Sequence, residues 1–273
     1  GNIKILKRNK SQKKTIKNLR TNILKLSHKA KSSHVGGCLS IVEILTVLFN
    51  NILKTSINRK KFFEDIFILS KGHACLALYC MLYEKKILSK KTLFGYGENN
   101  SLLMSHASHY VPGVKLSTGS LGHGLPVAIG SALVAKKEKK RKNIYVLLSD
   151  GELNEGTTWE SLLFAAHHKL DNLCVIIDYN KLQSLTFVSK TIKIEPIVSK
   201  IKSFNCFVKS INGHNINQLI NAFKIKSKNK PKVIIANTIK GKGFSFMENN
   251  IAWHYKSPNF FELNKALKEV ENA

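Results

Sequence analysis

Two polar residues thirty positions apart stand where buried strands are expected to end. Asp150 follows the apolar run IYVLL (144–148) and precedes Gly151, and Asn180 follows the apolar run LCVIID (173–178). If these strands are parallel, their carboxyl ends share one edge of a sheet, where the two side chains converge. A carboxylate and an amide oxygen are hard ligands, suited to Mg²⁺ or Ca²⁺. Because two side chains are too few for Mg²⁺, the pattern favours a metal-bridged diphosphate, with the Gly151 N–H open to a phosphate oxygen.

The elements that must position these residues alternate between strand and helix. Apolar runs predict strands, and apolar spacing with a period of three to four residues predicts helices. Strands are expected at 65–70, 144–149, 173–178, 205–211 and 232–239, and helices at 15–30, 40–49, 74–85, 155–168 and 215–225, with a glycine-rich loop and helix at 117–137. This order predicts an α/β fold with a parallel sheet and helices on both faces. We expect one domain over 15–258, a basic N-terminal extension over 1–14 and a C-terminal helix or tail over 259–273.

The formal charge of +27 raises the question of a nucleic-acid partner. Almost all the basic residues are lysines scattered along the chain, and only four are arginines: Arg8, Arg20, Arg59 and Arg141. A surface that reads bases would use arginine and interleaved aromatic residues instead. We therefore expect solvated lysine faces and no nucleic-acid partner. A basic nucleic-acid binder stays open as an alternative, which salt-dependent retention on DNA would favour.

The sequence carries few signs of targeting. No apolar run approaches the roughly 18 residues that a membrane span requires, and the basic start lacks the apolar core of a secretory signal. An amphipathic organelle presequence stays open. The five cysteines form no CxxC pair, and several lie in apolar runs. Buried free thiols in a reducing compartment, and hence a cytoplasmic protein outside the membrane, are the expectation.

The stretch SDGELNEGTTWESLLFAAHHKLDNLCVIIDYNKLQS (149–184) resembles the thiamine diphosphate motif of transketolases. That family usually begins the motif with Gly-Asp-Gly, where this chain has Ser149. The resemblance implies that Asp150, Asn180 and the backbone carbonyl of Leu182 bind Mg²⁺, with Ca²⁺ as an alternative metal. It also implies that Gly151 and Asn180 contact the diphosphate of the cofactor.

Further stretches extend the resemblance, in the family's order, over roughly residues 15–258. KSSHVGGCLS places His34 at the substrate, and FILSKGHACLALY carries a cofactor-binding histidine, His73. In SHASHYVPGVKLSTGSLGHG, His106 resembles a substrate-side histidine, while NTIKGKGFSFMENNIAWHYKSP supplies Lys240 and His254 near diphosphate and substrate. The loop of Gly119, Ser120 and Leu121 would hold the aminopyrimidine through its backbone. A single loop histidine is more often structural, so the joint order of these motifs carries the inference.

The resemblance also implies a missing half of the site. In transketolases, the glutamate that contacts the pyrimidine ring of the cofactor lies in a second domain. This chain covers roughly the first half of a full-length member of the family. It therefore resembles the N-terminal, diphosphate-binding subunit of a split transketolase, with a separate C-terminal pyrimidine-binding subunit in a heterotetramer of two plus two. Glu155 resembles the carboxylate that links active sites across subunits.

The implied reaction transfers a two-carbon ketol unit from a ketose phosphate to an aldose phosphate, as in the pentose phosphate pathway. His34, His106 and His254 would hold hydroxyl groups and shuttle protons. A transketolase-like enzyme for another sugar, and a non-catalytic cofactor-binding chain, stay open as alternatives.

Overall fold

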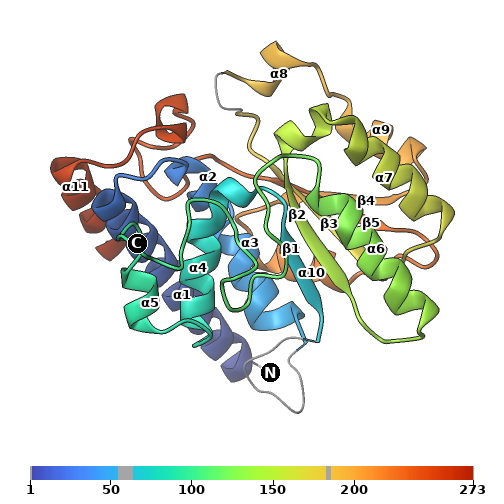
Figure 1. Ribbon diagram of the computed structural model, residues 1–273, viewed down its shortest axis with the longest axis horizontal. Coiled ribbons are helices and arrows are strands. Elements are labelled where there is room, and N and C mark those ends of the chain that lie inside the picture. The colour runs from blue at the N-terminus through green and yellow to red at the C-terminus, as the bar shows by residue number, and fades with distance from the viewer. Residues whose placement is uncertain (1, 55–63, 183–185, 273) are drawn as a thin grey trace.

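Five parallel strands form a single sheet in the order β1-β2-β3-β5-β4 (Figure 1). The computed structural model describes residues 2–54, 64–182 and 186–272, with side chains from residue 10 onward except at position 188. The strands are β1 (Ile66–Leu69), β2 (Ile144–Ser149), β3 (Leu173–Tyr179), β4 (Phe207–Asn212) and β5 (Lys232–Asn237). The α/β fold with a parallel sheet is thereby confirmed, and every expected strand is present.

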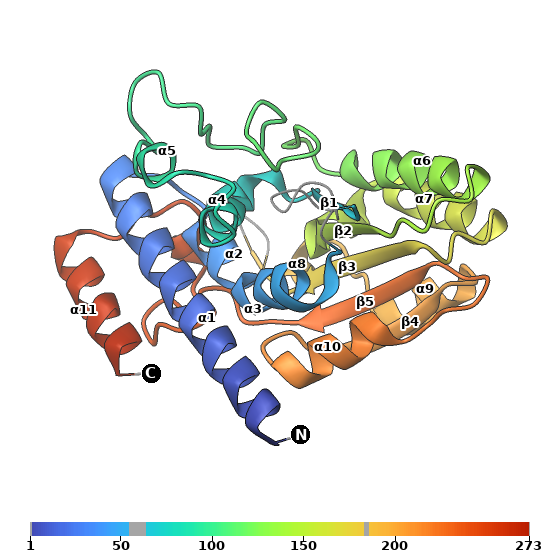
Figure 2. The same cartoon turned by 90° about the horizontal axis from the view of Figure 1, so that it is seen from below.

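The central strands are buried on both faces because their alternate side chains enter two separate cores. Leu147 and Ile176 pack into one core, and Val146 and Val175 into the other. The first core is closed by α1 (Asn2–Ala30), α3 (Val42–Val47), α4 (Cys75–Glu84) and α10 (Ile216–Lys224), and the second by α6 (Gly124–Lys137), α7 (Gly156–His167) and α9 (Ile197–Ser203). Figure 2 shows α6 and α7 on one side of the sheet and α10 on the other. Each fully buried aliphatic side chain stabilises this arrangement by about 1.5–3 kcal/mol.

The two terminal helices pack together on the first face of the sheet. Helix α1 runs without a break through positions 14 and 15, since no proline or glycine interrupts residues 2–30. Helix α11 (Phe260–Glu271) packs against α1 (Figure 2). The basic segment 10–14 is thus part of a helix whose Gln12 side chain is buried and hydrogen-bonded to Asn51.

Short elements complete the described chain. They are α2 (Val35–Leu39), a π-helical turn (Leu48–Ile52), α5 (Lys90–Phe94), α8 (Val188–Thr191), and 3₁₀ turns at Gly72–Ala74, Asp150–Asn154 and Ile251–His254. No helix of the described ranges is long and apolar enough to cross a membrane. All five cysteines are buried and free, which confirms the expected thiols.

The strand order reverses after β3, and this reversal places a site. The chain leaves β3, passes through α9, β4 and α10, and returns in β5 between β3 and β4. In open parallel sheets, ligands bind beside such a reversal at the carboxyl ends of the strands. Lys71, Asp150, Asn180 and Lys240 all follow directly or closely upon strand ends at this edge.

Candidate active site

A cavity of about 330 Å³ opens at the carboxyl edge of the sheet. All but one of the residues predicted for the site line this cavity. They are His34, His73, His106, Gly119, Leu121, Asp150, Gly151, Glu155, Asn180, Leu182, Lys240 and His254. The exception is Ser120, an exposed residue of the same loop as Gly119 and Leu121. The last two residues of the 149–184 motif, Gln183 and Ser184, lie outside the described chain. The structure therefore brings together residues that are up to 220 positions apart, from His34 to His254.

The acidic side of the cavity is formed by Asp150 and Asn180. Asp150 is only 2% exposed, and its Oδ2 accepts a hydrogen bond of 2.7 Å from the backbone N–H of Lys181. Burial, and then the charge of Asp178, raise the pKa of Asp150 to about 7. Among the described residues, Asp150 takes part in no ion pair. A buried carboxylate without a countercharge is suited to a metal cation.

The donor atoms around Asp150 fit a hard divalent cation. Asn180 and the carbonyl of Leu182 line the same cavity, which adds an amide and a peptide oxygen to the carboxylate. Within the described ranges, no group of three His, Cys, Asp or Glu side chains could hold a metal, so this set differs from a zinc site. Three oxygens leave positions for a ligand's phosphate oxygens and water, which is the way proteins usually bind Mg²⁺.

Two buried lysines face this acidic side. Lys240 is 3% exposed, and its Nζ donates to the Leu182 carbonyl at 3.3 Å and lies 3.0 Å from His254 Nδ1. Burial, and then the charge of Lys71, lower the pKa of Lys240 to about 8. Burial and the same Lys71 charge hold the pKa of His73 well below its ordinary value. A phosphate group here would compensate the charge of Lys240, which belongs to no ion pair among the described residues. The cavity therefore combines an oxygen site for a metal with a basic site for an anion.

Four histidines meet at the mouth of the cavity. The ring of His34 lies 5.2 Å from that of His73, 6.0 Å from His106 and 4.9 Å from His254, between centroids. Burial, and then the neighbouring His106, lower the pKa of His34 to about 4; burial and Lys240 lower that of His254 to about 3. Neutral imidazoles both donate and accept hydrogen bonds, which suits them to hydroxyl groups and proton transfer.

The backbone at His34 is strained. Its φ of 69° is left-handed, a conformation that costs about 1–3 kcal/mol for a residue other than glycine. The His34 N–H donates a hydrogen bond of 2.7 Å to the carbonyl of His254. This bond fixes the two histidines relative to each other, and strain that is held in this way is typical of functional sites.

A buried ion pair beneath the cavity was not predicted from the sequence. Lys71 Nζ lies 2.6 Å from Asp178 Oδ2, and the two side chains are 1% and 0% exposed. Asp178 also accepts hydrogen bonds from Ser40 Oγ at 2.6 Å and from Asn180 Nδ2 at 3.3 Å. With its Nδ2 directed to Asp178, Asn180 presents its Oδ1 to the Leu182 N–H and the cavity. The sequence does contain a signal for Asp178, because a charged residue at the end of the otherwise apolar run LCVIID indicates a buried charge.

A second network supports the loop that carries Lys240, and it too was missed. His214 Nε2 accepts a hydrogen bond of 2.8 Å from the N–H of Ile239, and His214 Nδ1 lies 3.0 Å from Glu43 Oε2. Because Nε2 is the acceptor, Nδ1 carries the proton that is donated to Glu43. Arg20 also pairs with Glu43. Glu43 and His214 are 171 positions apart, so no local pattern could have linked them.

Ser149 does not disturb the start of the motif. Its φ is −82°, a conformation open to any residue, so glycine is not required here. The Ser149 N–H donates a hydrogen bond of 2.8 Å to Glu152 Oε2, and the buried Glu152 also accepts from the Gly122 N–H at 3.1 Å. The turn that presents Asp150 therefore forms with serine in place.

Fold and site together define an α/β domain whose cavity is suited to a phosphorylated cofactor. Residues 11–259 match the family model of the transketolase, thiamine diphosphate binding domain. The chain belongs to the transketolase family, and the match covers most of its length.

The relatives include single subunits of transketolases and full-length transketolases. An apulose-4-phosphate transketolase subunit from Actinobacillus succinogenes is 43% identical over 245 residues, which cover 88% of each chain. A 6-deoxy-6-sulfo-D-fructose transketolase subunit from a Clostridium species is 37% identical over 242 residues, covering 87% of this chain and 88% of its own. The solved transketolase of Campylobacter jejuni superposes with a TM-score of 0.85 at 29% identity. That comparison covers 95% of this chain and only 42% of the solved one, so the chain spans less than half of the length of that enzyme.

Proposed function

We propose that this chain is the N-terminal, diphosphate-binding subunit of a split transketolase. In this proposal it transfers a two-carbon ketol unit from a ketose phosphate to an aldose phosphate, with thiamine diphosphate and Mg²⁺. The single observation that supports it most is the cavity lined by Asp150 and Lys240, a buried carboxylate and a buried ammonium group that both lack an ion-pair partner in the described chain. A metal-bridged diphosphate matches this separation of charge.

Thiamine diphosphate, when bound, supplies the stabilised carbanion chemistry that two-carbon transfer requires. The proposed metal ligands are Asp150, Asn180 and the Leu182 carbonyl. Lys240, His73 and the Gly151 N–H would bind the diphosphate, and the loop of Gly119, Ser120 and Leu121 would hold the aminopyrimidine. His34, His106 and His254 would orient substrate hydroxyls and move protons, and their depressed pKa values, where resolved, favour the neutral form that both tasks need.

The proposed partner is a C-terminal, pyrimidine-binding subunit that supplies the other half of the cleft. A divided enzyme is supported by the Actinobacillus relative, which is named as one subunit of a transketolase and matches this chain over 88% of its own length. An apolar outer face on α6 and α7 supports assembly, because Val127, Val134, Leu163 and Phe164 are 44–57% exposed. Glu155, the residue before α7, would link active sites across subunits. We propose a heterotetramer of two plus two, located in the cytoplasm as the five free thiols suggest.

The sugar is the open part of this function. A pentose phosphate transketolase is one candidate, and an enzyme for another sugar is the second. The second is favoured by the relatives named for apulose-4-phosphate and 6-deoxy-6-sulfo-D-fructose. The candidates are separated by measuring turnover with the reconstituted complex. Rates with pentose and hexose phosphates are compared with rates with apulose-4-phosphate and 6-deoxy-6-sulfo-D-fructose.

The Asp150→Ala variant tests the central claim. In the reconstituted complex, Mg²⁺-dependent binding of thiamine diphosphate, measured by calorimetry, should weaken by more than roughly a hundredfold, since even outer partners of a metal contribute 10–100-fold. Asp171→Ala is the matched control, because Asp171 lies at the opposite edge of the sheet and should leave binding unchanged. Equal affinities for the two variants would remove Asp150 as a ligand.

A further inference from the structure

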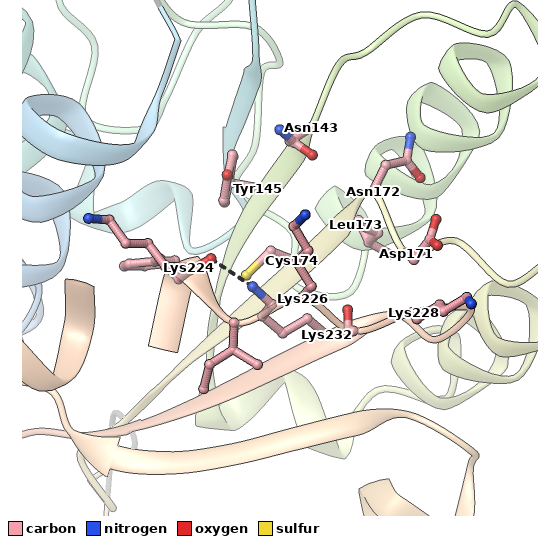
Figure 3. Close-up of a pocket in the computed structure, with 13 residues that line it drawn as sticks. Asn143, Tyr145, Asp171, Asn172, Leu173, Cys174, Lys224, Lys226, Lys228 and Lys232 are labelled. Carbon is pink, nitrogen blue, oxygen red and sulfur yellow. Dashed lines mark hydrogen bonds between the residues drawn. The ribbon is translucent and has the colours of Figure 1, made fainter. Parts of the chain in front are cut away.

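A second cavity lies at the amino edge of the sheet, away from the candidate active site. It measures about 400 Å³ and is formed by the starts of β2, β3 and β5 and by the loop that follows α10. Figure 3 shows Lys226 and Lys232 on one side of it and Asn143, Asn172 and Asp171 on the other. None of these residues takes part in the proposed reaction, so the cavity requires a separate explanation.

The charge of this cavity is strongly positive. Its lysines are Lys224, Lys226, Lys228 and Lys232, and none of them belongs to an ion pair among the described residues. Asp171, the acidic residue that the described lining contains, accepts hydrogen bonds from Lys136 Nζ at 2.9 Å and from the Asn229 N–H at 3.1 Å. Because Lys136 already compensates Asp171, the lysines of the cavity keep their charge uncompensated.

Buried polar atoms in the lining also lack partners. Lys232 is 7% exposed, and its Nζ donates to the Phe223 carbonyl at 2.7 Å, drawn as a dashed line in Figure 3. Burial lowers the pKa of this ammonium. Ser227 is 6% exposed, and neither its Oγ nor the buried Oδ1 of Asn172 has a hydrogen-bond partner within the described structure. Buried polar atoms in folded proteins are nearly always hydrogen-bonded. Ser227 and Asn172 both line this cavity, so a ligand toward which their side chains turn would supply the missing partners.

We propose that this cavity binds a small phosphate monoester that carries hydroxyl groups. The phosphate would lie between the ammonium groups of Lys226 and Lys232, since lysine is an ordinary phosphate donor. With its side chain turned toward the cavity, Ser227 Oγ would donate a further hydrogen bond. Asn172 Oδ1 is an acceptor, so it requires a donor on the ligand, which a hydroxyl group provides. Lys232 and Ser227 lie too deep for the flat surface of a macromolecule, which favours a small molecule. The inference does not depend on the proposed transketolase activity.

Calorimetric titration with glycerol 3-phosphate tests the site. The titration uses the Lys240→Gln chain, which lacks the lysine of the candidate active site that belongs to no described ion pair. We expect saturable binding at one site, and no heat from glycerol, which lacks the phosphate. Absence of glycerol 3-phosphate binding to a folded Lys240→Gln chain would overturn the proposal.

Three further variants in the same background locate the bound phosphate. Lys226→Gln and Lys232→Met should each weaken binding about tenfold, the effect of losing one charge-assisted hydrogen bond. Lys209→Gln is the control, because Lys209 is exposed on β4 and outside the cavity, and it should change affinity by less than about twofold. Circular dichroism checks that Lys232→Met folds, and the exposed Lys226 provides the decisive variant if it does not. Equal weakening by Lys226→Gln and Lys209→Gln would show non-specific attraction to a basic surface and refute the site.

Discussion

The buried pair of Lys71 and Asp178 allows a quantitative prediction about stability. Both side chains are at most 1% exposed, so removal of one charge leaves the other without solvent. In Asp178→Asn, the Lys71 ammonium keeps the Gly37 carbonyl, at 3.3 Å, and the amide oxygen of the new side chain as acceptors, but it loses its countercharge. Breaking a buried ion pair in this way costs about 3–5 kcal/mol. We expect the free energy of unfolding of Asp178→Asn to fall by that amount.

The reverse variant should be milder. In Lys71→Met, the Asp178 carboxylate still accepts hydrogen bonds from Ser40, Thr238 and Asn180. These donors offset part of the lost charge, each contributing about 1.5–3 kcal/mol in hydrogen bonds to a charged group. We therefore expect Lys71→Met to lower the free energy of unfolding by less than Asp178→Asn does. This asymmetry distinguishes a buried pair inside a donor network from an isolated pair.

A double-mutant cycle measured by urea denaturation provides the test. The two single variants and Lys71→Met/Asp178→Asn should give a coupling free energy above about 1.5 kcal/mol, within the range for residues in one network. The pair of Lys136 and Asp171, 38% and 34% exposed, is the control, and its coupling should stay between about 0 and 1 kcal/mol. Additive effects of the Lys71 and Asp178 variants, within about 0.5 kcal/mol, would refute the reasoning.

Three other variants probe the supports of the site. Burial raises the pKa of Glu43, but the His214 hydrogen bond and the Arg20 charge outweigh burial and lower the pKa overall. The contribution of Glu43 to stability is therefore present above its unfolded pKa and is lost as pH falls through its folded pKa. Glu43→Gln should therefore destabilise by about 3 kcal/mol at pH 7, and the difference in urea midpoint from the original chain should shrink in acid. His214→Phe removes the acceptor for the Ile239 N–H and should weaken thiamine diphosphate binding about tenfold in calorimetry; unchanged affinity would deny His214 a positioning role. Ser149→Gly should leave that affinity within about twofold and lower stability by roughly 0.5–1 kcal/mol, and a clear gain in affinity would show that serine hinders the cofactor.

The strands could be predicted from the sequence because most of them are buried on both faces. A run such as LCVIID is apolar without alternation, and it corresponds to β3 at Leu173–Tyr179. The helix expected at 40–49 is less regular: α3 covers Val42–Val47 and passes into a π-helical turn at Leu48–Ile52. A single turn of this kind depends on the packing around it, which the spacing of apolar residues does not encode.

The site was partly predictable for a related reason. Asp150 and Asn180 follow strands in the sequence, so their convergence depends only on the strands being parallel neighbours, and β2 does pair with β3. The insertion of β5 between β3 and β4 brings Lys240 beside Leu182, and no local pattern specifies that order. Pairs such as Glu43 and His214 depend on the same long-range arrangement, and this is why they were missed.

The two cavities lie at opposite ends of the same strands, and this limits how they can influence each other. Cys174 in β3 lines the amino-edge cavity, and Asn180, the residue after β3, lines the carboxyl-edge cavity. Six residues of extended strand separate the two residues by about 20 Å. At that distance one unit of charge changes the energy of another by about 0.8 kcal/mol for an effective dielectric constant near 20, before salt screening. Since the Debye length at physiological salt is about 8 Å, a phosphate bound at Lys226 and Lys232 should change thiamine diphosphate affinity by less than about fourfold. A larger change, measured by titrating the cofactor with and without saturating glycerol 3-phosphate, would mean that the strands themselves move.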